Sequence, residues 1–290
     1  MQNSFLGTCR SWGLQALPAD ERTLLRYVAF LKLGKNLAGA TIKVHLSAIR
    51  HLHLFNGFQD PLLFRPRLAL LRQAMNKQGS GPDKRRPVTV EMLREWVARV
   101  KSYPSFDNIL FLAGALIAFF GLLRISEFAA PEKGDGKRGL RLQDIKFRGR
   151  WVELAIWDSK TDTTREGLSV VLARRDDLLC PVTWLANFIV LRPRGAKSGQ
   201  LFVRGDGRPM TRGWFRDRLK RECAGTGVTG NVNTHSLRIG GASAAAAAGL
   251  ADVEIQRLGR WKSGAFLRYI RPSPANQAHL NLKIFPILSP

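Results

Sequence analysis

The sequence of 290 residues is poor in cysteine, in tyrosine and in long apolar runs. Its three cysteines, Cys9, Cys180 and Cys223, are widely spaced, which excludes a disulfide framework and a cysteine-rich zinc motif and favours a reducing compartment. The longest apolar run, 109–123, is shorter than the roughly 17–25 residues that span a bilayer. Residues 1–13 lack a basic start followed by an apolar core, so no secretory signal is expected.

Negative charge is also scarce. The chain has 46 Lys and Arg against 22 Asp and Glu, a net charge of +24 at pH 7. Such an excess repels itself unless a polyanion neutralises it, and nucleic acid is the usual partner. A basic RNA-binding protein is an alternative that charge alone leaves open, but no aromatic stacking platform for RNA is evident. The hydrophobic content of 45% is that of a folded chain rather than a disordered one.

Glycine, proline and charge replace periodic apolar residues at positions 77–87, which predicts a linker there. We therefore expect a helical module over 1–76 and a larger domain with a C-terminal tail over 88–290. Residues 1–86 carry 14 basic and 4 acidic side chains, a net +10, so the first module is the more densely basic. Basic residues on a helix more often form a solvated surface than a binding site. The interpretation as a DNA-binding surface assigns contacts to Lys43, Arg50, Arg72, Lys84, Arg85 and Arg86.

After the linker, the periodicity predicts mostly helices and one hairpin of strands. Residues 151–157 alternate as a strand does, and 168–172 would pair with them antiparallel across a loop at 158–165. Thr41 is expected to cap a helix of the first module, and Gly249 to end an alanine-rich helix. Helices of the second domain are expected over 89–100, 109–123, 181–191, 212–222, 236–248 and 252–258. The fold class is thus mainly α with a small antiparallel β-sheet, in two domains.

Three residues suit the binding of a phosphate. His235 and Arg238 are three apart at a helix start, which places an imidazole beside a guanidinium at an end that favours anions. Arg124 follows the most apolar helix and needs an anionic partner. Glu127 is a structural candidate for that partner, and a bound phosphate is a functional one.

Two further residues suit a nucleophile and a general acid. Tyr269 lies between arginines near the chain end, where a positive field favours a phenolate-like nucleophile, whereas Tyr27 fits the apolar face of a helix. Lys160 lies in the expected hairpin loop, and lysine acts as a general acid when neighbouring cations and burial lower its pKa. Each residue alone has an ordinary structural explanation. Together, their order favours phosphodiester transfer through a tyrosyl intermediate.

In sequence order, these residues resemble the catalytic series of the tyrosine recombinases. The matching segments are GLLRISE with Arg124, SKTD with Lys160, HSLR with His235 and Arg238, LGRW with Arg260 and Trp261, and then Tyr269. The stretch TIKVHLSAIRHLH resembles the core-binding domain of that family, so the resemblance covers nearly the whole chain. The segments HSLRIGGASAAAAAG and LGRWKSGAFLRYIR look closest to the recombinases of DIRS-like retrotransposons and Crypton-type transposons of eukaryotes.

The resemblance implies a two-domain recombinase architecture and a role for each residue. Tyr269 would attack the scissile phosphate to form a 3′-phosphotyrosyl link, with His235 assisting proton transfer. Arg124 and Arg238 would stabilise the non-bridging oxygens, and Lys160 would protonate the leaving 5′-oxygen. No metal, cofactor or ATP is then expected, since guanidiniums replace a cation and the covalent link conserves bond energy.

One position departs from the family pattern. The family has His or Trp nine residues before the tyrosine, where this chain has Arg260. Trp261, eight residues before Tyr269, is chemically the better match, so we assign that role to Trp261 and a DNA contact to Arg260.

The resemblance also implies partners and a place of action. Double-stranded DNA is the expected partner, with a homodimer on one site and a tetramer in the synaptic complex, and neither a membrane nor a small-molecule substrate. A nuclear location follows for a eukaryotic mobile element, and the cytoplasm or nucleoid otherwise. Two alternatives stay open: a type IB topoisomerase-like enzyme, and a domesticated DNA-binding protein that no longer cuts.

Overall fold

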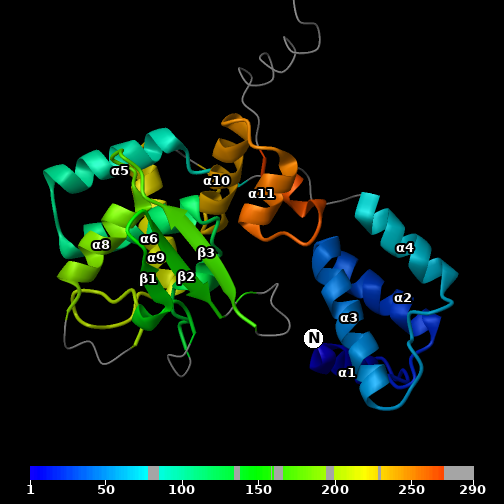
Figure 1. Ribbon diagram of the computed structural model, residues 1–290. Helices are drawn as coiled ribbons and strands as arrows, with labels where there is room; N and C mark the ends of the chain where they lie inside the picture. The colour runs from blue at the N-terminus through cyan, green and yellow to red at the C-terminus, as the bar shows by residue number, and fades with distance from the viewer. Residues whose placement is uncertain are drawn as a thin grey trace, which may run out of the picture. The chain divides into compact units, whose positions relative to one another are not determined.

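The computed structural model describes residues 1–77, 85–133, 138–157, 159, 166–193, 199–227 and 230–270. The chain divides into two compact units, Met1–Lys84 and Arg85–Pro290 (Figure 1). Each unit has a hydrophobic core of its own. Most of the linker expected at 77–87 lies outside the described residues.

The described part of the first unit is helical. Its elements are α1 (Gln2–Ser11), α2 (Glu21–Ala29), a π-helical turn (Phe30–Gly34), α3 (Gly39–Phe55) and α4 (Pro66–Lys77). Asp20 caps α2, since its side chain accepts a hydrogen bond from the backbone N–H of Thr23 at 2.7 Å. Tyr27 is fully buried in the core, as expected, and its hydroxyl lies 3.0 Å from Nδ1 of His45.

The start of α3 corrects one prediction. Thr41 was expected to cap this helix, but α3 begins two residues earlier, at Gly39, and no side chain caps it. A Cβ added at Gly39 would lie 3.2 Å from the carbonyl oxygen of Met75 on α4. The close approach of α4 thus accompanies a helix start at the glycine, a tertiary effect that propensity does not contain.

The second unit combines helices with one small sheet. Its elements are α5 (Val90–Ser102), α6 (Phe106–Phe120), α7 (Ile125–Phe128), the 3₁₀ turn η2 (Leu142–Asp144), β1 (Ile145–Phe147), β2 (Trp151–Ile156), β3 (Leu168–Ala173), α8 (Pro181–Leu191), α9 (Arg212–Gly225), α10 (His235–Ala247), α11 (Asp252–Gly259) and the 3₁₀ turn η3 (Gly264–Arg268). The expected fold class, mainly α with a small antiparallel sheet, is confirmed.

Helix α6 forms the centre of this unit. All its residues from Leu110 to Phe119 are buried, and it packs against α5, α8 and α10. A helix that is apolar all round is a core helix, because no face is left for solvent. The helix ends at Phe120, three residues before the expected end, since Leu122 takes a left-handed conformation with φ of 48°. Arg124 therefore lies beyond a sharp turn and not on α6.

The strands β2 and β3 pair antiparallel, as expected, from Trp151 opposite Ala173 to Ile156 opposite Leu168. Strand β1 joins on the other edge of β2. Buried side chains alternate along β2 and β3, so one face of the sheet packs on the core. Of the loop that joins the strands, 158 and 160–165 lie outside the described residues.

Glycines let α10 approach its neighbours at backbone distance. A Cβ at Gly240 would collide with the carbonyl of Val88, and one at Gly241 with the carbonyl of Phe119. Gly249, with φ of 86°, follows the end of the helix as expected. Beside α10, a small cluster of Leu122, Ala242, Ile255, Trp261 and Phe266 joins the turn after α6 to α11 and η3.

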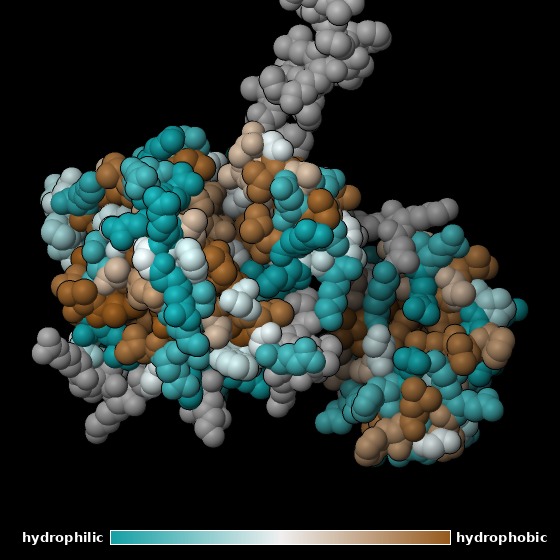
Figure 2. Space-filling view, in the orientation of Figure 1, coloured by the Kyte–Doolittle hydropathy of each residue, from teal (hydrophilic) through white to brown (hydrophobic). Residues whose placement is uncertain are grey.

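The outside of the protein is mixed in character. Figure 2 shows hydrophilic and hydrophobic residues interspersed over the visible face of each unit. None of the helices in the described ranges is long and apolar enough to cross a membrane.

Candidate active site

The turn after α6 holds a buried ion pair. Arg124 is the N-cap of α7, and its Nη1 donates to Oε1 of Glu127 at 2.9 Å. The side chain of Glu127 is 0% exposed and that of Arg124 is 16% exposed. The backbone N–H of Arg124 donates to Oε2 at 2.9 Å, and the hydroxyl of Ser159 donates to Oε1 at 3.0 Å. The structural partner that the sequence offered for Arg124 is therefore present.

Arg260 approaches the same carboxylate from the other side. It follows α11 in a left-handed conformation with φ of 57°, and its Nη2 donates to Oε2 of Glu127 at 3.1 Å. Its Nη1 also donates to the carbonyl of Gly121 at 3.0 Å. With a side-chain exposure of 12%, Arg260 lies inside the cluster. The DNA contact expected of it stays a prediction.

Opposing effects set the charge of Glu127. Burial favours its neutral form, but the charges of Arg260 and Arg124 and the backbone N–H of Arg124 outweigh burial and hold the pKa of the carboxyl below its ordinary value. Burial likewise lowers the pKa of Arg260, against the attraction of Glu127. Glu127 is thus an anion at neutral pH that holds two cations in place.

Arg238 is the most enclosed of the three arginines, with 1% exposure. Its Nη1 donates to the carbonyl of Leu122 and its Nη2 to the carbonyl of Gly259, and its guanidinium lies over the ring of Trp261, 4.1 Å from the centroid. Burial and the nearby charge of Arg124 lower the pKa of Arg238 to about 9, so it remains a cation at pH 7. Arg238 joins the turn after α6 to the end of α11.

The stacking of Trp261 explains a glycine that the sequence reasoning did not single out. A Cβ added at Gly259 would overlap the ring of Trp261. Only glycine therefore fits in LGRW when the indole folds back over the helix end towards Arg238. The glycine two residues before the tryptophan is visible in the sequence. The ring contact that requires glycine there is visible only in the structure.

Tyr269 directly follows η3 and is half-buried. Its ring centroid lies 5.5 Å from that of Trp261 and 6.5 Å from that of His235. The guanidinium carbon of Arg85 lies 5.9 Å from the same centroid. The hydroxyl of Ser243 on α10 donates to the backbone carbonyl of Tyr269 at 2.9 Å. Side chains from both ends of the second unit's described sequence thus meet at this phenol.

His235 is the first residue of α10, as expected. Its backbone N–H donates to Oδ1 of Asn233 at 2.9 Å, and the backbone N–H of Asn233 donates to the hydroxyl of Ser236 at 3.1 Å. These reciprocal bonds fix the helix start that carries the imidazole. The structure therefore brings together Arg124, His235, Arg238, Trp261 and Tyr269, with Arg260 added.

The remaining assigned residues lie elsewhere or are not described. Lys160 and Lys84 lie outside the described residues. In the first unit, Lys43 is exposed on α3 and Arg72 is half-buried on α4, while Arg50 forms an ion pair with Asp60 at 2.5 Å. Within the described ranges, no group of three or more His, Cys, Asp or Glu residues has an arrangement that holds a metal ion.

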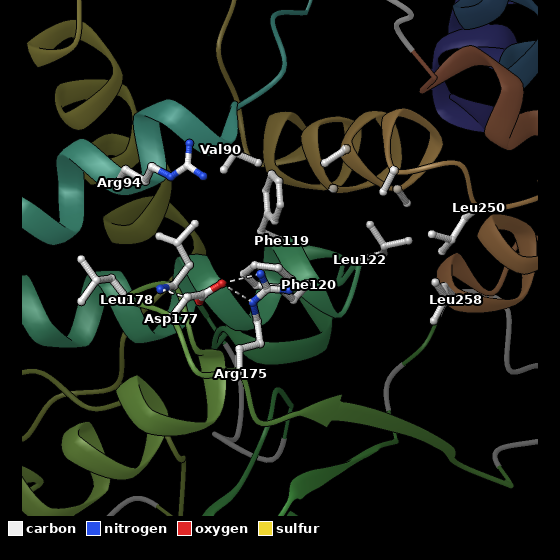
Figure 3. A pocket seen from close by; sticks show the side chains of 15 residues that line it. Val90, Arg94, Phe119, Phe120, Leu122, Arg175, Asp177, Leu178, Leu250 and Leu258 are labelled. Atoms are coloured by element: carbon white, nitrogen blue, oxygen red, sulfur yellow. Dashed lines mark hydrogen bonds and ion pairs between the residues drawn. The ribbon is translucent and has the colours of Figure 1, made fainter. Parts of the chain in front are cut away.

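A cavity of about 570 Å³ lies between α6, α10, α11 and the segment after β3 (Figure 3). Phe119, Phe120, Leu250 and Leu258 are among its lining side chains. Its charged residues are Arg94 and the ion pair of Arg175 with Asp177, drawn with dashed lines in Figure 3. The rest of the lining is mostly apolar, and two of the three charged side chains are paired with each other. None of the described residues that the sequence assigned to catalysis lines this cavity.

Neither a scan against protein-family models nor a search of curated proteins found a match. Solved structures do match. The XerA recombinase has a TM-score of 0.54 and 12% identity over 98% of this chain and 90% of that chain. The Tn1549 transposon integrase in complex with transposon right end DNA has a TM-score of 0.60 and 13% identity, over 93% of this chain and 86% of that chain. The XerH site-specific recombinase bound to a palindromic difH substrate has a TM-score of 0.59 and 15% identity, over 91% of this chain and 70% of that chain.

These structures are tyrosine recombinases, so the protein has the fold of that family. At 12–15% identity the likeness shows the fold alone. Which members of the family are nearest, including those of DIRS-like and Crypton-type elements, stays a prediction.

Proposed function

We propose that this protein is a DNA recombinase that cleaves and rejoins strands through a 3′-phosphotyrosyl intermediate. The observation that carries the proposal is the meeting of Arg124, His235, Arg238, Trp261 and Tyr269 in one cluster. They come from turns and helix ends that are far apart in sequence. A core requires no such grouping of a half-buried phenol with an imidazole and guanidiniums.

The proposed reaction balances without an external reagent. The Tyr269 oxygen attacks the scissile phosphorus, the new phosphorus–oxygen bond forms, and the bond to the 5′-oxygen breaks. The phenol proton passes towards His235, and Lys160 supplies a proton to the leaving 5′-oxygen. Attack of the free 5′-hydroxyl on the phosphotyrosine reverses these steps and releases Tyr269.

Arginine charge would stabilise the transition state. Two arginines bind the Glu127 carboxylate and Arg238 is a third cation close by, so the cluster keeps a net charge of about +2 at neutral pH. Arg124 and Arg260 are more exposed than Arg238, whose two terminal nitrogens already donate to carbonyls. Contact of Arg238 with a phosphate oxygen, as proposed from the sequence, requires one of those hydrogen bonds to be exchanged.

Duplex DNA is the proposed partner. The net charge of +24 supports a polyanionic ligand. Similar structures include XerH bound to its difH substrate and a lambda integrase dimer bound to a core site, the latter with a TM-score of 0.53 and 14% identity over 93% of this chain and 70% of that chain. We propose a dimer on one site and a tetramer at synapsis, and a nuclear location in a eukaryotic mobile element.

Trapping of a covalent intermediate tests the proposal. A pool of nicked random-sequence duplexes, in which cleavage releases a short fragment and prevents religation, is incubated with the protein in excess EDTA. The wild type should form a denaturant-resistant adduct that maps to Tyr269. The Tyr269→Phe variant should bind the pool and form no adduct. Tyr103→Phe is the matched control, because Tyr103 is 75% exposed and remote in sequence from the cluster.

The other outcomes contradict the proposal in distinct ways. An adduct on Tyr27 or Tyr103 would overturn the assignment of the nucleophile. Binding without any adduct would indicate a silent DNA-binding protein. Relaxation of supercoiled DNA, with no joining of two duplexes, would indicate a type IB topoisomerase-like enzyme.

A further inference from the structure

We propose that Arg85 is a positioning residue for Tyr269 and links the segment that enters the second unit to the nucleophile. The inference rests on the proposed function, in which Tyr269 attacks the phosphate. The sequence assigned Arg85 only to DNA binding.

The entering segment is attached to the start of α10. Arg85 pairs with Asn231 in a parallel bridge, and the backbone N–H of Arg86 donates to the Asn231 carbonyl at 3.0 Å. The backbone N–H of Val88 donates to the carbonyl of Ser236 at 2.9 Å. Gly240 lies against the Val88 carbonyl, where no Cβ fits. These contacts fix the segment beside the residues that carry His235.

Arg85 extends from this fixed backbone to the phenol. Its guanidinium carbon lies 5.9 Å from the Tyr269 ring centroid, within the range of a cation–π contact. Trp261 and His235 contact the same ring from other parts of the chain. Tyr269 follows a short 3₁₀ turn near the end of the described chain, so the turn itself offers little to fix the ring. Arg85 adds a cation to these ring contacts.

The position of the ring matters because attack needs the phenol oxygen in line with the leaving oxygen. Proper orientation of reacting groups contributes strongly to rate, and small displacements are costly. The loss of a partly exposed cation–π contact changes an equilibrium or rate by roughly two- to fivefold. Arg85 should therefore tune the rate of cleavage without being essential to it.

A first measurement reads the contact without any reaction. Tyrosine labelled with ¹³C at the ring carbons gives signals for only three residues, and Tyr27→Phe and Tyr103→Phe assign the remaining signal to Tyr269. Arg85→Ala should shift and narrow the Tyr269 signal, because the ring moves more freely. Arg86→Ala, which removes the same charge from an exposed neighbour, should leave the signal in place.

A second measurement reads the consequence. At saturating nicked DNA, Arg85→Ala should form the covalent adduct roughly two- to fivefold more slowly than the wild type. Arg85→Lys should restore part of the rate, since it keeps a cation. Arg94→Ala, on the exposed side of α5, controls for the loss of one positive charge and should keep the wild-type rate.

A direct phosphate contact gives a different pattern. It would weaken DNA binding and lower the slope of log Kd against log salt by about 0.9, and the rate at saturation would be unchanged. Weaker binding with an unchanged rate at saturation would overturn the inference, and so would a Tyr269 signal that is unchanged in Arg85→Ala. A wild type that forms no adduct overturns the proposed function instead, and the labelled spectrum still reports whether the contact exists.

Discussion

Arg260 donates a hydrogen bond to the buried carboxylate of Glu127 at 3.1 Å, across 133 positions of the chain. Through this contact the turn after α11 is joined to the turn after α6. Arg124 uses the other oxygen of the same carboxylate. One acidic residue therefore determines where two of the three clustered cations lie.

Removal of this carboxylate should destabilise the second unit. Glu127→Gln keeps the shape but leaves two largely buried guanidiniums without an anion, which should cost about 3–5 kcal/mol in the free energy of unfolding. Urea unfolding followed by tryptophan fluorescence measures the loss. Glu91→Gln is the control, because the ion pair of Glu91 with Arg94 is exposed to solvent. Equal stability of Glu127→Gln and the wild type would contradict the ion-pair account.

The same pair predicts a dependence on pH. The pKa of Glu127 is lower in the folded state than in the unfolded chain, so its contribution is complete above the ordinary glutamate range near about 4.3 and is lost as the pH falls through the lower folded-state value. The stability difference between the wild type and Glu127→Gln should therefore shrink as the pH is lowered from 7 towards 3. A difference that grows on acidification would give the wrong sign.

Gly259 should tolerate no side chain. Gly259→Ala places a Cβ inside the ring of Trp261, so the indole must leave its place over Arg238. We expect a loss of about 1–3 kcal/mol and a changed tryptophan emission spectrum. Gly199→Ala is the matched control in the same unit, because a Cβ there meets nothing within 4 Å. Wild-type emission in Gly259→Ala would contradict the stacking.

The basic residues assigned to DNA binding in the first unit, Lys43, Arg50 and Arg72, should account for part of the salt dependence of DNA binding. Replacement of Lys43 and Arg72 by Gln should lower the slope of log Kd against log salt by about 1.8 if each contacts one phosphate. Arg94→Gln in the second unit should change the slope little. Arg50 is a weaker candidate, since Asp60 already binds it. A slope unchanged in the double variant would mean that these residues form no DNA clamp.

Lys160 is predicted to be the general acid. A 5′-bridging phosphorothioate supplies a leaving group that departs without a proton. Lys160→Ala should therefore be slow on normal DNA and largely restored on the sulfur substrate. Arg124→Ala should show no comparable recovery, because its charge acts on the non-bridging oxygens.

Failure of the sulfur substrate to rescue Lys160→Ala would move the acid elsewhere. Lys146, exposed on β1, would then be the next residue to replace. Recovery of both variants would instead mean that sulfur speeds cleavage without reporting on the acid.

The sequence by itself determined the elements and the residue types of the site. Periodicity predicted α5, α8, α10 and the β2–β3 hairpin, since an amphipathic or apolar pattern is a local property of the chain. It also selected His235 from its spacing to Arg238 at a helix start, and Tyr269 from its arginine neighbours near the chain end. It placed the end of α6 too late, because the left-handed turn at Leu122 is supported by carbonyl contacts from Arg238 and Arg260, more than a hundred positions away.

Only the tertiary structure decided how the arginines are used. From the spacing, the anionic partner of Arg124 could be either Glu127 or a phosphate. Arg260 and Trp261 were both candidates for the His or Trp position of the family. The fold gives Glu127 to both Arg124 and Arg260, and places Trp261 between Arg238 and Tyr269. A buried cation needs an anion, a carbonyl oxygen or an aromatic ring face as its partner. Which of these partners each arginine has depends on contacts between distant parts of the chain, so it cannot be predicted from the spacing of residues in the sequence.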